Sequence, residues 1–225
     1  MVKDKELEEL AHPEYWDKRY TSEQQKGEGA GADGIQQPIG SFEWFRTFEN
    51  LQPFLTKYLP APETGCQILH LGCGNSTLTA DLHTLGYTHQ TSIDFSTVII
   101  ATMKAKHASS LPSTIHWEVM DVRNLEIPNT SIEVAIDKGT LDAMIHGSLW
   151  DPPNDVRENV GAYVGEVSRV LKPGGLWLYI TYRQPHFMKP LLAREDIWTL
   201  DVEILDDGQG GFEYFGFIMR KKKIV

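Results

Sequence analysis

The most informative stretch of this sequence is Leu69-His-Leu-Gly-Cys-Gly-Asn-Ser76, where an apolar strand meets a glycine turn. The strand is predicted over residues 67–71, and a helix follows the turn. Glycines at such a turn let the backbone bend tightly and approach a ligand without a Cβ in the way. The dinucleotide fingerprint has a third glycine three residues later, where this chain has Thr77. The stretch therefore favours a cofactor without phosphates over a nicotinamide dinucleotide.

Strands and helices alternate along the chain after this turn. We predict strands over residues 67–71, 90–93, 115–119, 132–136 and 176–181, with helices over 76–85, 96–107 and 155–171. Alternation of this kind is typical of a parallel sheet flanked by helices. Two further strands, over 198–205 and 212–219, are joined by Asp206-Asp-Gly-Gln-Gly-Gly211, which is a hairpin-type connection. The sequence therefore predicts a parallel α/β sheet that finishes with an antiparallel pair.

The first 60 residues have a different character. Residues 1–20 have a helical pattern and carry the aromatic cluster Tyr15, Trp16 and Tyr20. We predict a flexible loop over residues 21–40, because they include the Gly-rich run over 26–34. Ser41 is the expected N-cap of a helix that contains Phe42, Trp44, Phe45 and Phe48, of which we expect Phe45 and Phe48 in the core.

Composition and charge exclude several classes of protein. The 225 residues fit one α/β domain, and 21 basic against 31 acidic residues give a net charge of −10. An acidic balance argues against binding of duplex nucleic acid, and apolar runs of about 20 residues, which a membrane span needs, are absent from the sequence. Two cysteines and a charged N-terminus indicate a reducing compartment. The histidines lack metal-ligand spacing, so we expect no metal site. We also expect the protein to be a cytoplasmic monomer.

Acidic residues follow three of the predicted strands. Asp94 lies 22 residues after Gly72, at the position from which a carboxylate holds a ribose diol. Asp121 follows the third strand, within reach of an adenine edge, and Asp137 follows the fourth. Each acid alone is equally explained as a helix cap or a loop residue. Together they favour a ligand pocket, because the carboxyl ends of parallel strands gather at one edge of the sheet.

Several of these motifs resemble those of one family. The strings Gly72-Cys-Gly-Asn-Ser76, Asp94-Phe-Ser96, Asp121-Val122 and Leu171-Lys-Pro-Gly-Gly175 resemble the motifs of class I S-adenosylmethionine-dependent methyltransferases. More narrowly, Tyr15-Trp-Asp-Lys-Arg-Tyr20, Phe42-Glu-Trp-Phe45 and Ile136-Asp-Lys-Gly-Thr-Leu-Asp-Ala143 resemble the eukaryotic elongation factor 1A lysine methyltransferases. The resemblance covers about residues 13–220. It implies a Rossmann-like, doubly wound α/β sheet of seven strands, mostly parallel with an antiparallel C-terminal strand.

The resemblance also implies a cofactor and a set of residues that contact it. The cofactor is S-adenosylmethionine, which leaves as S-adenosylhomocysteine, and the protein substrate is elongation factor 1A. Residues 1–60 would form a helical lid over a methyltransferase core of residues 61–225, within a single domain. The implied cofactor-binding residues are Trp16, Tyr20, Trp44, Gly72, Gly74, Asp94, Phe95, Asp121, Val122 and Lys138.

Methyl transfer to lysine needs a neutral amine, whereas a free lysine has a pKa of about 10.4. Some group must therefore accept or relay the proton, and Asp137 and Asp142 are the candidates by position. Both acids are equally explained as structural caps or ion pairs. The alternatives left open are methylation of a small molecule or another protein, and a non-catalytic cofactor-binding module. The Asn-Pro-Pro-Tyr motif of amide and adenine methylases is absent from the sequence, which argues against those substrates.

Overall fold

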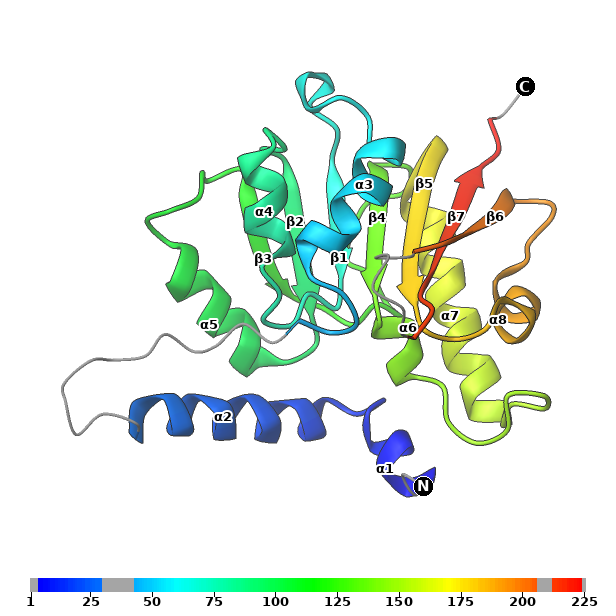
Figure 1. Ribbon diagram of the computed structural model, residues 1–225, viewed down its shortest axis with the longest axis horizontal. Helices are drawn as coiled ribbons and strands as arrows, with labels where there is room; N and C mark the ends of the chain where they lie inside the picture. Colours follow the sequence, from blue (N-terminus) through cyan, green and yellow to red (C-terminus); the bar gives the residue numbers. More distant parts are fainter. Residues whose placement is uncertain (1–3, 30–42, 206–211, 224–225) are drawn as a thin grey trace.

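The computed structural model describes residues 4–29, 43–205 and 212–223. Its centre is a seven-stranded sheet with the order β3-β2-β1-β4-β5-β7-β6 (Figure 1). The strands β1 to β5 run parallel, and β7 lies antiparallel between β5 and β6. This confirms the predicted doubly wound sheet with its antiparallel end. The strands are β1 (Ile68–Leu71), β2 (Gln90–Asp94), β3 (Ile115–Val119), β4 (Ile132–Lys138), β5 (Leu171–Thr181), β6 (Trp198–Ile204) and β7 (Phe215–Lys221).

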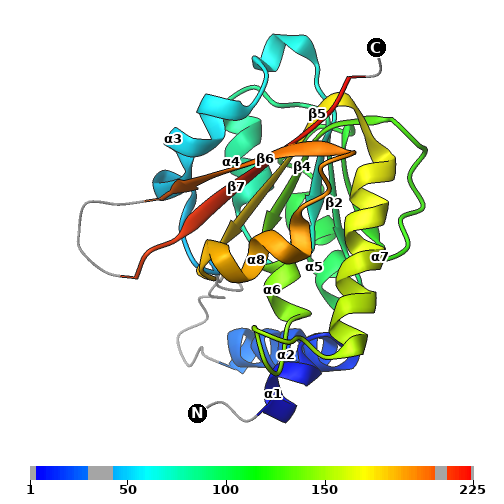
Figure 2. The same cartoon turned by 90° about the vertical axis from the view of Figure 1, so that its right-hand side faces the viewer.

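Helices cover both faces of the sheet, with α3 and α4 on one side and α7 and α8 on the other (Figure 2). The strand β5 shows why two cores form, because its side chains alternate between the faces. Leu178 packs in the core under α3 and α4, whereas Trp177 and Tyr179 pack in the core under α7 and α8. The helices are α1 (Asp4–Glu9), α2 (Pro13–Gly29), α3 (Phe48–Tyr58), α4 (Leu78–Thr84), α5 (Thr97–His107), α6 (Thr140–Ala143), α7 (Asn154–Val170) and α8 (Pro185–Leu192), with a 3-10 turn at Pro62–Thr64.

The strand β5 begins earlier than predicted. It starts at Leu171, which pairs with Ile132, and the register then shifts so that Leu176 pairs with Val134. Gly175 makes this shift feasible, because a Cβ there would lie 3.0 Å from the Glu133 carbonyl oxygen of β4. Glycine allows such a close approach of two backbones.

The helix α2 continues to Gly29, so the prediction of a loop from residue 21 is wrong for residues 21–29. The hydroxyls of Thr21 and Ser22 donate to carbonyl oxygens one turn earlier, and Arg19 pairs with Glu23 at 3.0 Å. Such i, i+4 pairs stabilise a helix. The rest of the predicted loop, together with Ser41 and Phe42, lies outside the described residues.

The helix predicted to run through Trp44 and Phe45 is wrong over residues 43–47, because α3 begins only at Phe48. Phe45 has a φ of 67°, which a helix does not allow. The Glu43 side chain and the Trp44 carbonyl instead bond to distant parts of the chain. Tertiary contacts thus override the local helical preference here. Among the described residues, no helix is both long and apolar enough to cross a membrane.

Candidate functional site

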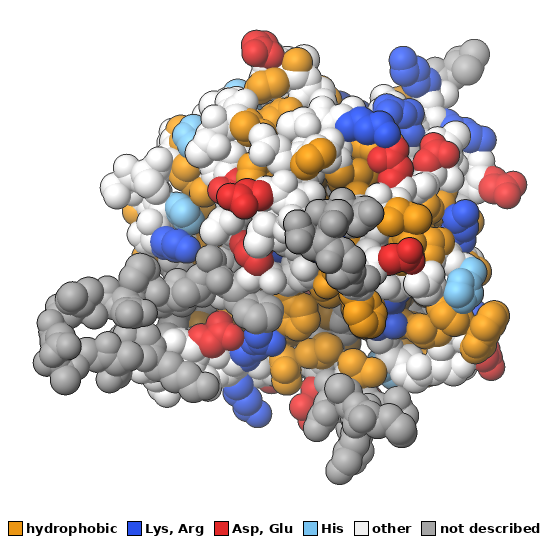
Figure 3. Space-filling model, viewed as in Figure 1, with side chains coloured by type: hydrophobic (Ala, Val, Ile, Leu, Met, Phe, Trp, Pro, Cys, Tyr) orange, Lys and Arg blue, Asp and Glu red, His pale blue; other side chains and the backbone are white. Residues whose placement is uncertain are grey.

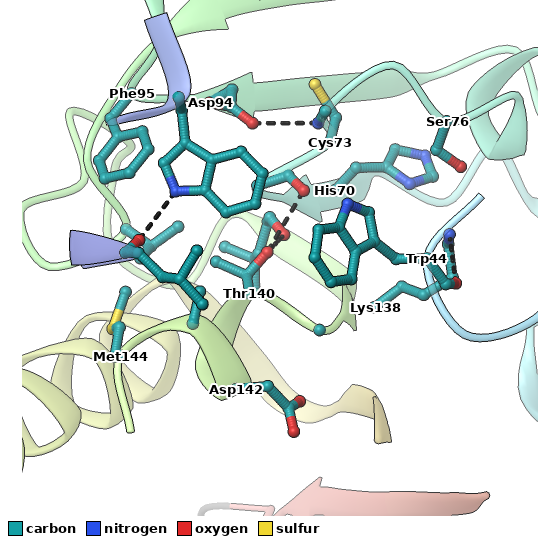
Figure 4. Close-up of a pocket in the computed structure, with 18 of the residues that line it drawn as sticks. Trp44, His70, Cys73, Ser76, Asp94, Phe95, Lys138, Thr140, Asp142 and Met144 are labelled. Carbon is teal, nitrogen blue, oxygen red and sulfur yellow. Dashed lines mark hydrogen bonds between the residues drawn. The ribbon is translucent and has the colours of Figure 1, made fainter. Parts of the chain in front are cut away.

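A cavity of about 140 Å³ lies at the carboxyl ends of the central strands (Figure 4). The strand order reverses between β1 and β4 at this edge, where doubly wound sheets bind their ligands. Its wall comes from the turns after the five parallel strands, β1 to β5, and from the N-terminal segment, defined here as residues 4–29 and 43–60. The helix α2 of this segment lies across that edge of the sheet (Figure 1).

The glycine turn after β1 is packed tightly against its neighbours. Gly72 and Gly74 both have left-handed backbones, with φ of 65° and 51°. A Cβ on Gly72 would lie 2.1 Å from the Thr140 hydroxyl, and one on Gly74 would lie 3.1 Å from the Tyr20 hydroxyl. Thr140 in turn donates to the Leu71 carbonyl oxygen at 2.7 Å. The turn therefore requires glycine both for its φ and for its contact with the start of α6.

Asp94 ends β2 and is held by backbone amides. Its carboxylate oxygens accept hydrogen bonds from Gly74 and Ser96, each at 3.0 Å. Burial raises the pKa of Asp94 to about 6, although these two amides pull it down. Each oxygen keeps further acceptor capacity, so the carboxylate is able to accept both hydroxyls of a ribose diol. Phe95 lies beside it and also lines the cavity (Figure 4).

The structure brings Val122 to the cavity wall but not Asp121. Met120 lines the wall instead. The Asp121 carboxylate accepts from the Arg123 amide at 2.8 Å and from its guanidinium at 2.7 Å. Burial opposes ionisation, but Arg123 holds the pKa of Asp121 below its usual range. A planar guanidinium two residues away is a stronger partner than a neutral adenine amine, which explains why the carboxylate turns to Arg123.

Trp16, Tyr20 and Trp44 meet over the cavity. The Trp16 ring centroid lies 5.8 Å from that of Tyr20 and 5.8 Å from that of Trp44. Trp16 and Tyr20 are buried, and the Trp16 Nε1 donates to the Leu10 carbonyl oxygen at 2.8 Å. The Asp17 carboxylate accepts from the hydroxyl of Ser96, the N-cap of α5. This contact ties α2 to the body of the protein.

A buried ion pair that the sequence did not reveal joins the N-terminal segment to β4. Lys138 Nζ lies 2.7 Å from a Glu43 carboxylate oxygen. It also lies 3.0 Å from the carbonyl oxygen of Trp44, which Figure 4 shows beside Lys138. Glu43 also accepts from the Thr77 amide at 2.7 Å and the Ser76 hydroxyl at 2.9 Å. Burial lowers the pKa of Lys138, and Glu43 opposes that effect. We call Glu43 and Lys138 the clasp; the two residues stand 95 positions apart.

Asp137 is not brought to the cavity, because it lies inside β4 and is fully buried. Its carboxylate accepts from the Thr140 amide at 2.7 Å, the Leu141 amide at 3.1 Å and the Tyr163 hydroxyl at 2.9 Å. Burial, together with the nearby Asp142, raises the pKa of Asp137 to about 7. The Asp137 carboxylate therefore caps the N-terminal end of α6.

Asp142 does line the cavity, at its lower edge in Figure 4. It accepts from the Thr181 hydroxyl at 2.6 Å, the Tyr179 hydroxyl at 2.8 Å and the Arg183 Nε at 3.1 Å. Burial raises its pKa, and Arg183 acts in the opposite direction. Arg183 itself is a lining residue that sequence reasoning missed, because no motif marks it.

Phe45, predicted in the core, is half-buried and lines the cavity, whereas Phe48 packs against the core under α3 and α4. Tyr182 was not singled out in the sequence; its ring centroid lies 5.3 Å from that of Phe45, and its exposed fraction is 38%. The neighbours Thr181 and Arg183 are buried. Tyr182 thus lies at the rim of the cavity.

Proteins of similar sequence include methyltransferases that act on a translation factor. A family model described as a methyltransferase domain matches residues 62–204. The mouse EEF1A lysine methyltransferase 4 is 36% identical over 215 residues, which cover 94% of this chain and 76% of that protein. The bovine eEF1A lysine and N-terminal methyltransferase is 36% identical over 232 residues, which cover 98% of this chain but 30% of that protein.

Solved structures of other methyltransferases share the fold of this chain. A SAM-dependent methyltransferase from Methanosarcina mazei has a TM-score of 0.56 at 19% identity, covering 76% of this chain and 98% of that one. A TehB-like SAM-dependent methyltransferase from Corynebacterium glutamicum has a TM-score of 0.57 at 16% identity, covering 94% of this chain and 100% of that one. At such low identity these neighbours show the shared architecture alone.

Proposed function

Because the chain belongs to the S-adenosylmethionine-dependent methyltransferases of class I, we propose that it is a protein-lysine N-methyltransferase acting on translation elongation factor 1A. The observation that carries this proposal is the 94% of the chain that aligns with a relative named for that activity. The aligned length is too great for the core of residues 61–225 alone, so it also takes in part of the N-terminal segment.

The cavity has the chemistry that a phosphate-free nucleoside needs. Asp94 would hold the ribose hydroxyls, Phe95 and Val122 would lie against the adenine, and the Gly72 turn would face the methionine part. The described lining residues include two cations, Lys138 and Arg183, and both already pair with carboxylates. A pyrophosphate would therefore lack a free partner among them. When bound, S-adenosylmethionine supplies a methyl group that is electrophilic because it is attached to a sulfonium.

The chain's own residues would have to position the amine and remove its proton. Of the two candidate acids, Asp137 and Asp142, only Asp142 lines the cavity, and burial makes it a stronger base than an exposed aspartate. We assign it as the acceptor of the lysine proton. Asp137 would act through α6, whose first amides it holds, rather than by touching the substrate. Exclusion of water by the aromatic rings would favour the neutral amine.

The N-terminal segment would serve as the lid of this site, over a core that spans residues 61–225. Trp16, Tyr20 and Trp44 would then cover the bound cofactor, and Lys138 would hold the lid through Glu43. The net charge of −10 favours a basic protein partner over nucleic acid or an anionic membrane. We propose that the protein works as a cytoplasmic monomer.

The test is methylation of purified elongation factor 1A with S-adenosylmethionine carrying an isotopically labelled methyl group. We expect label on a lysine of the factor, located by mass spectrometry of its peptides. A cell extract treated in parallel shows which protein is labelled first. Label on other proteins but not on the factor would contradict the proposed substrate, and no label at all would contradict the enzyme.

A further inference from the structure

The cavity has two ends with different chemistry. Asp94 and Phe95 line one end, and Asp142 lines the other (Figure 4). Phe45, Gly139, Tyr182 and Arg183 accompany Asp142. The Asp94 end, which we assign to the nucleoside, is thus separated from the Asp142 end. The Asp142 end is rich in aromatic residues, and the cofactor assignment leaves it unused.

Phe45 occupies its place at a conformational cost. Its φ of 67° lies in the left-handed region, which is unfavourable for an aromatic residue. The ring fits because Gly139 lies under it: a Cβ there would come within 2.8 Å of the Phe45 ring. Gly139 itself has a φ of 89°. Strained residues of this kind cluster at ligand-binding sites, where the surrounding structure holds them.

Three rings from distant parts of the chain meet at this end. Phe45 lies 5.3 Å from Tyr182, which follows β5, and 5.7 Å from Tyr214, which precedes β7, between ring centroids. Tyr182 is 38% exposed, so the group extends from the cavity wall to the surface. Hydrophobic side chains gather on this face of the molecule, near the carboxyl ends of the strands (Figure 3). Phe45 and Tyr182 thus give the cavity an apolar wall near Asp142, against which a linear alkyl chain packs well.

Cations already engage two of these rings. The Arg46 guanidinium lies 4.4 Å from the Tyr214 centroid, and the Arg183 guanidinium lies 5.5 Å from the Tyr182 centroid. Ring faces attract ammonium groups in the same way, and they pack well against methylenes. The group therefore offers both ring faces and apolar surface to an alkylamine.

We propose that Phe45 and Tyr182, backed by Tyr214, form the passage that binds the aliphatic stem and amine of the acceptor lysine. This rests on the proposed function, because it assumes that the other end of the cavity holds the cofactor. It assigns to the residues before α3 and after β5 the recognition of the acceptor side chain. The amine reaches the cavity beside Asp142, which takes its proton.

The test is calorimetry with two probes on the full chain. S-adenosylhomocysteine reports on the cofactor end, and a sulfonium analogue with an aminobutyl arm in place of the methyl reports on both ends. We expect the arm to tighten binding about tenfold, with Tyr182→Leu and Phe45→Leu each removing threefold or more of that gain. Their affinity for S-adenosylhomocysteine should stay within about twofold, because the rings do not face Asp94.

Tyr58→Leu is the matched control, because Tyr58 is a half-buried tyrosine on α3 that does not line the cavity. It should keep the full gain from the arm. If the arm adds nothing while S-adenosylhomocysteine binds, the passage is wrong and the proposed function stands. Should neither probe bind, the proposed function fails and the passage fails with it. Equal losses for both probes in Tyr182→Leu would also overturn the passage, and this variant is decisive even where Phe45→Leu does not fold.

Discussion

The two ends of the cavity are held together in different ways. At the nucleoside end, backbone amides of consecutive strand-to-helix turns fix Asp94 in place. At the acceptor end, side chains from distant segments meet: Phe45 with Tyr182, and Asp142 with Arg183. A site held by backbone amides depends little on the identity of single residues. A site held by contacts between side chains changes with each substitution. We infer that the first end suits a constant cofactor and that the second is free to adapt to an acceptor.

The largest effect is expected at the acceptor end, from the variant Asp142→Asn. If Asp142 accepts the lysine proton, kcat should fall by about 100-fold or more, while S-adenosylhomocysteine binds as before. The amide keeps the size of the side chain and one of its two acceptor oxygens, so either Thr181 or Tyr179 keeps its acceptor. The measurement is kcat against pH for both proteins: activity of the unchanged enzyme is lost as the pH falls and Asp142 is protonated. If the variant keeps the same kcat and loses activity over the same low-pH range, Asp142 does not accept the lysine proton.

The next largest effect is expected at the opposite end, with Asp94→Ala. Affinity for S-adenosylhomocysteine should fall by about 30-fold to 100-fold, because the ribose hydroxyls would face a buried site without an acceptor. Calorimetry measures this directly. Asp121→Ala, which changes the acid after the neighbouring strand, should cost far less, since its carboxylate is bound to Arg123. Equal losses in the two variants would restore Asp121 to the cofactor site, and no loss in Asp94→Ala would remove Asp94 from it.

A third prediction concerns the clasp between Glu43 and Lys138. Glu43→Gln leaves a buried lysine without its counter-charge and should weaken docking of the N-terminal segment by about 2 kcal/mol. Limited proteolysis within residues 1–45 should then proceed roughly tenfold faster, and S-adenosylhomocysteine should restore part of the protection. Lys138→Met is the companion variant, because it breaks the same ion pair by removing the other partner. If both variants are cut at the unchanged rate, the clasp does not hold the lid.

The nucleoside end was predictable because topology fixes it. Parallel strands bring the residues that follow them to one edge, so the spacing of Gly72 and Asp94 was enough to place them together. Asp121 shows the limit of this argument, because its position was right but a neighbouring guanidinium decides where its side chain points. Spacing gives the location of a residue and not its partner.

Apart from Asp142, neither the acceptor end nor the clasp could be predicted by such arguments. The clasp joins residues 95 positions apart, and neither charge has a local pattern that reveals the other. Phe45 has an apolar side chain in an aromatic string, which favours a core helix until its left-handed backbone is known. The extent of α2 was missed because glycines in residues 26–34 outweighed the helix-forming residues before them. For the clasp and Phe45 tertiary contacts decide against the local preference, whereas local i, i+4 contacts extend α2.

The smallest predicted effect uses pH to compare the two ends within one unchanged protein. Asp94 accepts hydroxyls best as a carboxylate, and burial raises its pKa to about 6. Its ionised fraction, and with it the affinity for S-adenosylhomocysteine, should therefore fall about fourfold between pH 7.5 and pH 5.5. The sign follows from the raised pKa: protons compete with the ligand below about pH 6 and not above it. In Asp94→Asn this dependence should vanish, whereas Asp142→Asn should retain it.

The aminobutyl arm contacts the other end of the cavity, so the gain in affinity that it brings should not follow the Asp94 titration. A gain that does follow it would mean that ligand binding at the two ends is coupled.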